Sequence, residues 1–453
     1  MADLLSELQA RLPEQRIKTD VDVIAAYGQD RAVFEDAGTA AVLVTPHSTE
    51  EVVAAMKAAE AANAIVVPRG AGTGLTGAAN AIDGCMILSL HNMNEIIEID
   101  ATNRMARVQP GVINADLKEA TAKQGLYYPP DPASFDMSSI GGNVSTNAGG
   151  LCCVKYGVTR DYVIGLEVVL VDGSVINTGR RTLKSTTGLD LTGVFVGSEG
   201  LLGIITEVTV KLEAAPPPPE TAVAYFSELP ACGEAIQAIF NRGMQPTVME
   251  ILDRVSLEIV ERFYPMDLDL EAACLILMQS SPDDQPIEDL AAVCEEFGAT
   301  FVYHASDPQE GEQLLEVRRR VWPAAEQLGK AMLPEDVAVT RDKLPELLAG
   351  IDEIAKRLDL VMPVVGHAGD GNMHPMLIFD EHDTDEVKRI HQAFSEIVAL
   401  ALGLGGTLAG EHGVGTLKRQ FIEDEIDPVN LEMHRRVKAT FDPDNRLNPG
   451  KKL

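Results

Sequence analysis

The pattern of hydrophobic and polar positions predicts alternating strands and helices at the start of the chain. Residues 40–46 (AAVLVTP) form an apolar run that ends at a proline, and residues 48–63 begin with a serine cap and continue with helical spacing. A second apolar run, residues 64–70 (AIVVPRG), follows directly. This order predicts a strand–helix–strand unit. Its glycine-rich turn lies at the carboxyl end of a strand, where α/β sheets place their ligands.

Further apolar runs between turn residues predict more strands in the same part of the chain. Residues 162–177 (YVIGLEVVLVDGSVIN) contain an Asp-Gly turn between two apolar runs, which indicates a β-hairpin. Residues 116–126 predict a helix, and residues 1–36 predict a short helical lead-in. The remaining strand candidates are residues 86–93, 95–100, 104–111 and 201–213.

Four successive prolines at residues 216–219 mark a change in organisation. They remove four hydrogen-bond donors and hold the chain extended, so neither a helix nor a sheet continues through them. We therefore place a domain boundary here, after a first domain at residues 37–214. Helix and strand candidates alternate beyond the prolines, which predicts a smaller α+β domain over residues 215–409.

The charge balance restricts the possible partners. The 453 residues include 37 Lys and Arg against 69 Asp and Glu, a formal net charge of −32, and 45% of them are hydrophobic. Such a surface repels phosphate backbones and anionic membranes, so nucleic acid is not an expected partner. An anionic substrate would need a buried arginine or a metal ion of its own.

The N-terminal residues and the cysteines indicate an intracellular chain. The first residues carry acids and lack the basic and apolar segments of a signal peptide, so we expect a cytoplasmic protein without an integral membrane segment. The six cysteines show no CxxC spacing, which disfavours an iron–sulfur cluster and predicts reduced thiols. The adjacent Cys152 and Cys153 could form a redox pair, but ordinary packing is the better interpretation.

Three glycine-rich clusters occur in the first domain. Residues 68–80 (PRGAGTGLTGAAN) follow a strand, and their glycines reach backbone angles that can turn amides inward around a diphosphate. Their spacing matches neither a Walker A motif nor GxGxxG, so a mobile turn is the alternative. Residues 138–150 add small and Asn side chains, and residues 197–206 supply a third cluster. Three clusters exceed what turns alone require.

Histidines stand in two glycine-rich motifs near the C-terminus, GHAGDGNMH and GEHGVG. His367, His374 and Glu411 form one candidate metal triad, because imidazole and carboxylate suit a Zn- or Mn-like divalent cation. These ligand types do not separate Zn from Mn. Three protein ligands leave a coordination position for a substrate, and the adjacent His412 is left to move protons.

Seven motifs occur in order along nearly the whole chain. Together they resemble the FAD-linked D-2-hydroxy acid dehydrogenases, a family that includes D-lactate dehydrogenase, the glycolate oxidase FAD subunit and D-2-hydroxyglutarate dehydrogenase. The motifs are PRGAGTGLTGAA, PPDPASFDMSSIGGNVSTNAGG, GLEVVLVDGSVI, GSEGLLGIITEVTVKL, GHAGDGNMH, GEHGVGTLK and DPDNRLNPGK. The resemblance implies an α+β protein with a vanillyl-alcohol-oxidase (PCMH-type) FAD-binding domain and a C-terminal α+β cap domain with an antiparallel sheet. Residues 410–453 would return to the FAD domain.

The resemblance also implies which residues hold FAD. The diphosphate would be contacted by Arg69, Gly70, Gly72, Thr73, Gly74 and Gly77. The flavin and ribityl region would be lined by Gly142, Asn143, Thr146, Asn147 and Gly149, with Asn448 returning to the flavin. The adenosine end would be held by Glu199, Gly203 and Ile205. Relatives that tether FAD often use a histidine near the diphosphate loop; none occurs between residues 48 and 90, so we predict non-covalent FAD.

The implied activity is oxidation of a D-2-hydroxy acid to the 2-oxo acid, with hydride transfer to flavin N5. A metal lowers the pKa of the bound hydroxyl, and His412 would accept its proton. The substrate carboxylate needs a cation, and Arg318, Arg319 and Arg320 stand together in the second domain. Such a run is often a solvated helix face, so one arginine is expected to point inward. Alignment with the family favours Arg318, followed by Arg319.

The substrate and the electron acceptor are less specified. Hydroxyglutarate enzymes use a further threonine and lysine for the distal carboxylate, where this chain has Trp322 and residues 333–336 (LPED). That departure favours D-lactate, glycolate or another short monocarboxylate, with D-2-hydroxyglutarate as the alternative. Because no haem or cluster motif is present, the acceptor is external: a quinone, a cytochrome, an electron-transfer flavoprotein or an iron–sulfur subunit, with oxygen left open. Through it the protein could be peripheral at the inner face of the membrane, and a homodimer is one option.

Two other classes of protein are alternatives to a hydroxy acid dehydrogenase. A non-redox flavin transferase resembling alkylglycerone-phosphate synthase would need a basic phosphate pocket and a histidine run, and neither is evident in the sequence. An inert flavoprotein subunit that only binds partners would not need His367, His374, Glu411 and His412 intact.

Overall fold

The computed structural model describes residues 3–283 and 285–453, and the chain divides into two compact units. The first unit contains residues 1–150, 157–215 and 411–453. The second contains residues 151–156 and 216–410. The chain therefore passes from one unit to the other at the peptide bonds after residues 150, 156, 215 and 410.

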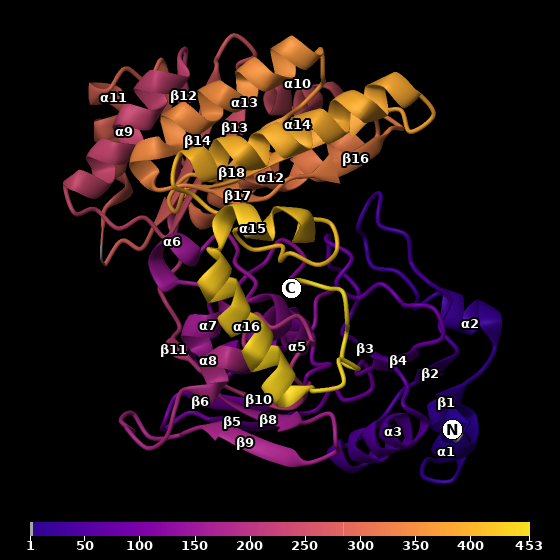
Figure 1. Ribbon diagram of the computed structural model, residues 1–453. Helices are drawn as coiled ribbons and strands as arrows, with labels where there is room; N and C mark the ends of the chain where they lie inside the picture. The colour runs from indigo at the N-terminus through magenta and orange to yellow at the C-terminus, as the bar shows by residue number, and fades with distance from the viewer. Residues whose placement is uncertain (1–2, 284) are drawn as a thin grey trace. The chain divides into compact units, whose positions relative to one another are not determined.

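A four-stranded sheet in the first unit is built on the predicted strand–helix–strand segment (Figure 1). Helix α3 (Thr49–Ala62) begins after Ser48, whose Oγ accepts from Glu51 N, and it buries its apolar side against the sheet. The parallel strands at its two ends both pair with a third strand that lies between them. The strand order is β1 (Ile17–Lys18), β2 (Val42–Val44), β4 (Met86–Ser89) and β3 (Val66–Arg69).

The N-terminal lead-in is not helical throughout, which corrects the prediction for residues 1–36. It contains α1 (Leu4–Gln9), η1 (Glu14–Arg16) and α2 (Val21–Ala25), but strand β1 lies between the last two and pairs antiparallel with β2. A two-residue strand at a sheet edge has no periodicity that a sequence pattern could reveal.

A second sheet of the first unit has five antiparallel strands. Its last two strands form the predicted hairpin around Asp172-Gly173, and Leu170 N donates to Ser174 O at 2.8 Å across the turn. The strand order is β5 (Ile96–Asp100), β6 (Met105–Val108), β10 (Ile204–Lys211), β8 (Val163–Val169) and β9 (Val175–Gly179). The remaining elements of the first unit before the prolines are α4 (Asn114–Ala122), β7 (Leu126–Tyr127), α5 (Ile140–Thr146), α7 (Thr159–Tyr162), α8 (Leu191–Phe195) and β11 (Glu213–Ala214), while α6 (Cys153–Tyr156) belongs to the second unit.

The C-terminal segment closes the first unit with α15 (Ile422–Glu425) and α16 (Pro428–Phe441). Val66 N donates to Arg446 O at 2.8 Å and Asn448 N donates to Val66 O at 2.9 Å, so the segment adds a parallel bridge to the edge of β3. The buried Lys438 Nζ donates to Leu201 O and Leu447 O at 2.8 Å each. The bonds to Val66 and Leu201 tie the C-terminal segment to β3 and to the turn before β10, which lie hundreds of positions earlier in the chain.

The second unit is built around an eight-stranded antiparallel sheet. Strand β14 is buried along its whole length, which explains its nearly continuous apolar sequence. The strand order is β15 (Phe301–His304), β12 (Glu220–Phe226), β14 (Cys274–Ser280), β13 (Val248–Asp253), β18 (Val364–His367), β19 (Asn372–Phe379) and β16 (Ala331–Pro334), and β17 (Val337–Ala338) also pairs with β19.

Helices cover this sheet (Figure 1). The face that carries Val248 and Leu252 of β13 and Val365 of β18 shares a core with α10 (Arg254–Phe263) and α12 (Pro308–Glu326). The other long helices pack against one another in the order α11 (Ile287–Glu296), α9 (Leu229–Asn241), α13 (Leu344–Leu358) and α14 (Thr384–Gly403). No helix among the described residues is both long enough and apolar enough to span a membrane.

Candidate active site

The glycine loop that follows β3 meets the N-terminus of α5 in the first unit. A Cβ at Gly70 would lie 2.7 Å from Ser139 Oγ, so only glycine allows this approach. Gly72 and Gly77 have φ of 75° and 77°, the left-handed region that other residues rarely adopt. The first two glycine clusters found in the sequence are therefore neighbours in space.

Arg69 is a buried cation beneath this loop. Its side chain fills the place of a Cβ at Gly72, with Nη2 only 2.0 Å from that position, and its guanidinium lies 5.8 Å from the Tyr27 ring centroid. Among the described residues its Nη1 has no hydrogen-bond partner, and burial lowers the pKa of Arg69. A diphosphate group would supply the missing acceptor and the missing negative charge.

The asparagine side chains of the second cluster form hydrogen bonds with other groups of the first unit. Asn143 Oδ1 accepts from Asn114 Nδ2 at 3.0 Å, and Asn143 Nδ2 donates to Ser138 Oγ at 3.1 Å. Asn147 ends α5 with φ of 57°, and its Oδ1 accepts from Arg160 N at 2.8 Å. These side chains shape the cluster, so contact with a cofactor here would come mainly from backbone and from the small residues.

The third cluster contacts both the C-terminal segment and the GEHGVG motif. Each oxygen of the buried Glu199 carboxylate accepts a hydrogen bond from a backbone amide, one from Val414 N at 2.9 Å and the other from Gly415 N at 2.8 Å. Asn448 Nδ2 donates to Glu199 O and to Ala78 O, while its Oδ1 is buried without a partner among the described residues. Gly203 packs on Val168, as a Cβ there would lie 2.5 Å from Cγ1.

The GEHGVG motif itself lies along the other clusters. A Cβ at Gly415 would lie 2.0 Å from Thr76 O of the glycine loop. A Cβ at Gly149, the end of the second cluster, would lie 2.4 Å from Glu411 Oε2. Glu411, a candidate metal ligand, is therefore beside Gly149, a candidate flavin contact, within the first unit.

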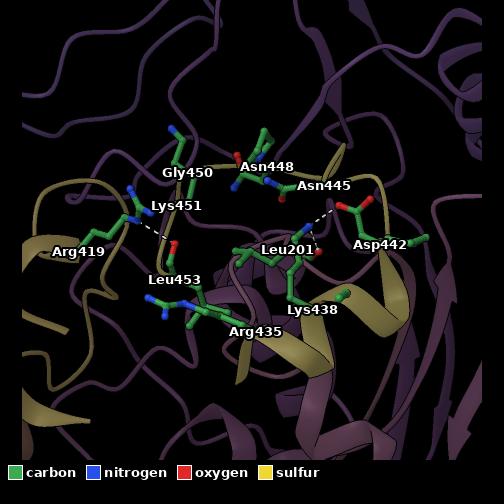
Figure 2. Close-up of a pocket in the computed structure, with 13 residues that line it drawn as sticks. Leu201, Arg419, Arg435, Lys438, Asp442, Asn445, Asn448, Gly450, Lys451 and Leu453 are labelled. Carbon is green, nitrogen blue, oxygen red and sulfur yellow. Dashed lines mark hydrogen bonds and ion pairs between the residues drawn. The ribbon is translucent and has the colours of Figure 1, made fainter. Parts of the chain in front are cut away.

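A basic cavity of about 270 Å³ opens on the C-terminal segment (Figure 2). Its lysines and one arginine already serve the fold: Lys451 Nζ donates to Gly77 O and Asn80 O, and Arg419 Nε donates to Leu453 O. Figure 2 also shows Lys438 directed at Leu201 and Asp442. The cavity thus reflects how the C-terminal segment is anchored beneath the glycine loop.

The two predicted histidines come together in the second unit. His367 ends β18 and pairs in register with Asn372 of β19, and His374 pairs with Val365. Their rings are 5.1 Å apart between centroids with an interplanar angle of 80°, and the residues are 4% and 7% exposed. The glycines between them permit this return, since Gly371 has φ of 83°.

Each histidine has a buried carboxylate at its Nδ1. His367 Nδ1 lies 2.6 Å from Glu250 Oε1, and His374 Nδ1 lies 3.8 Å from Asp336 Oδ1. Both acids have no exposed surface. A carboxylate that is hydrogen-bonded to Nδ1, as Glu250 is to His367, orients the imidazole so that Nε2 is presented to a metal. Asp336 is near His374 but beyond hydrogen-bond distance of its Nδ1. The sequence analysis missed both acids. For Glu250, the available signal was one charge inside the apolar run VMEILD.

The three arginines of α12 differ in their surroundings. The Arg318 side chain is 14% exposed, and its Nε donates to Glu250 Oε2 at 2.8 Å. Arg319 bonds to Glu312 and Glu316, and Arg320 to Glu316, with 45% and 44% of their side chains exposed. Only Arg318 of the three contacts a residue that also contacts a candidate metal ligand.

The positions at which the chain departs from the hydroxyglutarate enzymes lie in the second unit. Trp322 Nε1 donates to Glu326 Oε1 at 2.8 Å on α12. Glu335 and Asp336 are fully buried, and Asp336 Oδ1 accepts from Asn372 Nδ2 at 2.8 Å. No disulfide joins any of the six cysteines within the described residues.

Comparison with known proteins shows the family. The family described as "FAD linked oxidases, C-terminal domain" matches residues 215–452, and the one described as "FAD binding domain" matches residues 40–179. The chain is similar to glycolate oxidase subunit GlcD of Bacillus subtilis (strain 168), with 40% identity over 90% of this chain and 88% of that protein. It is also similar to D-lactate dehydrogenase of Anaerostipes hadrus, with 35% identity over 95% of this chain and 91% of that protein.

Solved structures show the same fold. The structure of p-cresol methylhydroxylase with substrate bound matches with a TM-score of 0.81 and 18% identity, covering 99% of this chain and 96% of that one. The fold is thus of the vanillyl-alcohol-oxidase (PCMH) type in an α+β protein, as predicted. The chain belongs to the FAD-linked oxidase family. More particularly, it is an FAD-dependent oxidoreductase of the glycolate oxidase and D-lactate dehydrogenase type.

Proposed function

We propose that this enzyme oxidises a short D-2-hydroxy acid, D-lactate or glycolate, to the 2-oxo acid with the help of a divalent metal. The observation that carries the proposal is the buried pair His367 and His374, in the same sheet as Glu250, which is hydrogen-bonded to His367 Nδ1 and to Arg318. FAD, when bound, accepts the hydride that leaves C2 of the substrate.

We assign the metal to His367, His374 and Glu411. Within the second unit, Gly410 packs on the side chain of Asn372, since a Cβ there would lie 2.3 Å from Nδ2. Asn372 is the register partner of His367. Glu411 follows Gly410 directly, and one peptide bond keeps their Cα atoms about 3.8 Å apart. Chain connectivity therefore supports a triad of two imidazoles and one carboxylate, a donor set suited to Zn or Mn.

His412 is proposed as the base that takes the substrate hydroxyl proton. It follows Glu411, and its Nε2 lies 3.8 Å from Glu411 Oε1. Glu411 also contacts Gly149 at the end of the second glycine cluster. The proposed metal ligand, the proposed base and a candidate flavin contact therefore lie close together in the first unit. Glu411 and His412 should therefore differ in their mutant phenotypes: loss of Glu411 removes metal, whereas loss of His412 leaves metal bound and slows proton transfer.

Arg318 is proposed to bind the substrate carboxylate, with Arg319 as the alternative. Among the described residues, Arg318 forms a hydrogen bond through Nε alone, which leaves the edge formed by Nη1 and Nη2 for a bidentate carboxylate. Arg319 Nη1 is already bonded to two glutamates of its own helix. A short monocarboxylate is favoured because Glu335 and Asp336, where hydroxyglutarate enzymes use a lysine, would repel a second carboxylate.

The test is anaerobic mixing of purified protein with a panel of D- and L-hydroxy acids, followed by turnover with an artificial dye acceptor. D-lactate or glycolate should bleach the flavin absorbance, and the L-isomer of lactate should bleach it far more slowly. Faster reduction by D-2-hydroxyglutarate would replace the monocarboxylate proposal. No bleaching by any acid would favour a non-redox transferase of this fold. The FAD should be released by acid precipitation, and retained flavin would contradict non-covalent binding.

The reduced flavin is proposed to pass electrons to an external acceptor, a quinone, cytochrome, electron-transfer flavoprotein or iron–sulfur subunit. Two relatives carry names that describe them as subunits of glycolate oxidase. That naming supports a protein partner as acceptor for this chain as well.

A further inference from the structure

We propose that Glu250 is a positioning residue that couples the substrate-binding arginine to the metal site. One oxygen of its carboxylate accepts from His367, and the other accepts from Arg318. The inference rests on the proposed function, because it assigns Arg318 to the substrate and His367 to the metal.

The sheet register explains why Glu250 meets both partners. Glu250 of β13 lies directly opposite His367 of β18, and Leu252 lies opposite Val365. Alternate residues of a strand share a face, so Glu250 and His367 point to the face that holds Val248, Leu252 and Val365. Helix α12, which carries Arg318, packs on that same face. The carboxylate therefore lies between a strand partner and a helix partner.

The contacts are short and enclosed. Glu250 Oε1 lies 2.6 Å from His367 Nδ1, and Glu250 Oε2 lies 2.8 Å from Arg318 Nε. The side chain of Glu250 has no exposed surface, and those of His367 and Arg318 are 5% and 14% exposed. Charge-assisted hydrogen bonds away from water hold their geometry more firmly than exposed ones.

Each contact has a chemical consequence. A carboxylate that accepts at Nδ1 keeps the proton on that nitrogen, so that the Nε2 lone pair of His367 is presented to a metal. The same carboxylate takes the Nε of Arg318, so the guanidinium offers its Nη1 and Nη2 edge to an incoming carboxylate. Because the two oxygens belong to one rigid group, a displacement of either partner is passed to the other.

The main test is Glu250→Gln, which keeps the shape but offers one oxygen and one amide group. It can accept from His367 or from Arg318, not from both, because its amide meets the other donor. In metal-stripped protein, Mn²⁺ affinity measured by electron paramagnetic resonance should fall about 10- to 100-fold. The KM for D-lactate should rise while flavin content per chain stays the same.

Glu261→Gln is the matched control. Glu261 is a carboxylate of the same unit whose Oε2 accepts from the backbone amides of Met266 and Leu268. Among the described residues it forms a hydrogen bond with neither His367 nor Arg318, so Mn²⁺ affinity and KM should match those of the wild type.

Arg318→Lys tests the coupling without altering Glu250. Lysine cannot reproduce both the Nε bond to Glu250 and the two-nitrogen edge, so the carboxylate loses one anchor. Mn²⁺ affinity should then fall although residue 318 is not a metal ligand. A cycle of Glu250→Gln, Arg318→Lys and the double variant should show non-additive changes in KM.

The outcomes separate this inference from the proposed function. Wild-type Mn²⁺ affinity and wild-type KM in Glu250→Gln would overturn the inference alone. Absence of Mn²⁺ or Zn²⁺ binding in the wild type would overturn the metal assignment instead. If Glu250→Gln fails to fold, Arg318→Lys decides: unchanged Mn²⁺ affinity there overturns the coupling, and reduced affinity supports it.

Discussion

At the scale of single residues, the candidate site depends on polar groups whose partners come from distant parts of the chain. Arg69 lies beneath the glycine loop with one nitrogen lacking a partner among the described residues. Glu250 serves a histidine and an arginine at once. The glycine-rich motifs indicated His367 and His374 as candidate ligands. No local pattern around Glu250 predicts its partners, because His367 is 117 positions away and Arg318 is 68 positions away.

The arginine assignment gives the first prediction. Arg318→Ala should raise KM for the hydroxy acid and lower kcat, with kcat/KM reduced about 10- to 100-fold, as a charge-assisted hydrogen bond is worth about 1.5–3 kcal/mol. Arg319→Ala removes only exposed ion pairs and should behave like the wild type. Steady-state kinetics with a dye acceptor measures both, and the reverse ranking would move the carboxylate role to Arg319.

At the scale of elements, two local features each depend on specific residues: the glycine loop after β3 and the N-terminal cap of α10. The glycine loop needs a left-handed Gly72 whose Cβ position is occupied by Arg69. Asp253 caps the N-terminus of α10, and its Oδ1 accepts from Ser256 N, Ser256 Oγ and Val364 N at 2.9, 2.6 and 3.0 Å. Sequence patterns predicted the loop, whereas the Val364 contact depends on how β18 packs beside the cap.

Gly72→Ala should reduce FAD binding, because it combines a strained φ with a clash on Arg69. Gly84→Ala is a close control: Gly84 has nearly the same φ, 74°, but no atom lies within 4 Å of its added Cβ. We expect flavin absorbance per chain to fall several-fold in Gly72→Ala and to remain near the wild-type value in Gly84→Ala. Equal loss in both variants would mean that backbone strain alone, without Arg69, explains the effect.

The cap of α10 predicts a pH dependence of stability. Burial raises the pKa of Asp253 to about 6, although its hydrogen bonds from Ser256 and Val364 act to lower it. The value in the unfolded chain is near 3.8. The folded state therefore holds this proton more tightly than the unfolded state, so the contribution of Asp253 to stability declines between pH 4 and 6 and stays low above that.

Asp253→Asn keeps an acceptor for the same donors and removes the charge, and asparagine is an equally good helix cap. It should stabilise the protein at pH 8 by about 1–3 kcal/mol and have little effect at pH 4. Thermal unfolding of both proteins at the two pH values measures the difference. A variant that is less stable than the wild type at pH 8 would show that the ionised carboxylate is favourable in the folded state.

At the scale of the whole molecule, the chain passes repeatedly between two units, and candidate sites stand at the crossings. Gly149 and Glu411 lie next to crossings after residues 150 and 410, and they contact each other in the first unit. The flavin clusters belong to the first unit and the histidine pair to the second. A net charge of −32 leaves an anionic substrate dependent on local cations such as Arg318.

This division predicts that FAD and the proposed metal can be removed separately. Chelation should abolish turnover without releasing flavin, since the glycine clusters belong to the first unit and the histidine pair to the second. Flavin absorbance after gel filtration and recovery of activity on adding Zn²⁺ or Mn²⁺ provide the measurement. Full activity in rigorously metal-free protein would remove the metal from the mechanism.

The sequence by itself determined most of the local elements, because glycine turns, caps and apolar periodicity act over a few residues. Its seven motifs, by their resemblance to a known family, also indicated the family and the α+β fold of the vanillyl-alcohol-oxidase type. It did not determine strand β1, the position of β4 between β2 and β3, or the roles of Glu250 and Asp336. Those depend on which strands become neighbours. Only the tertiary structure sets that register, because a buried charge is stabilised by partners that are distant in the chain and close in the folded sheet.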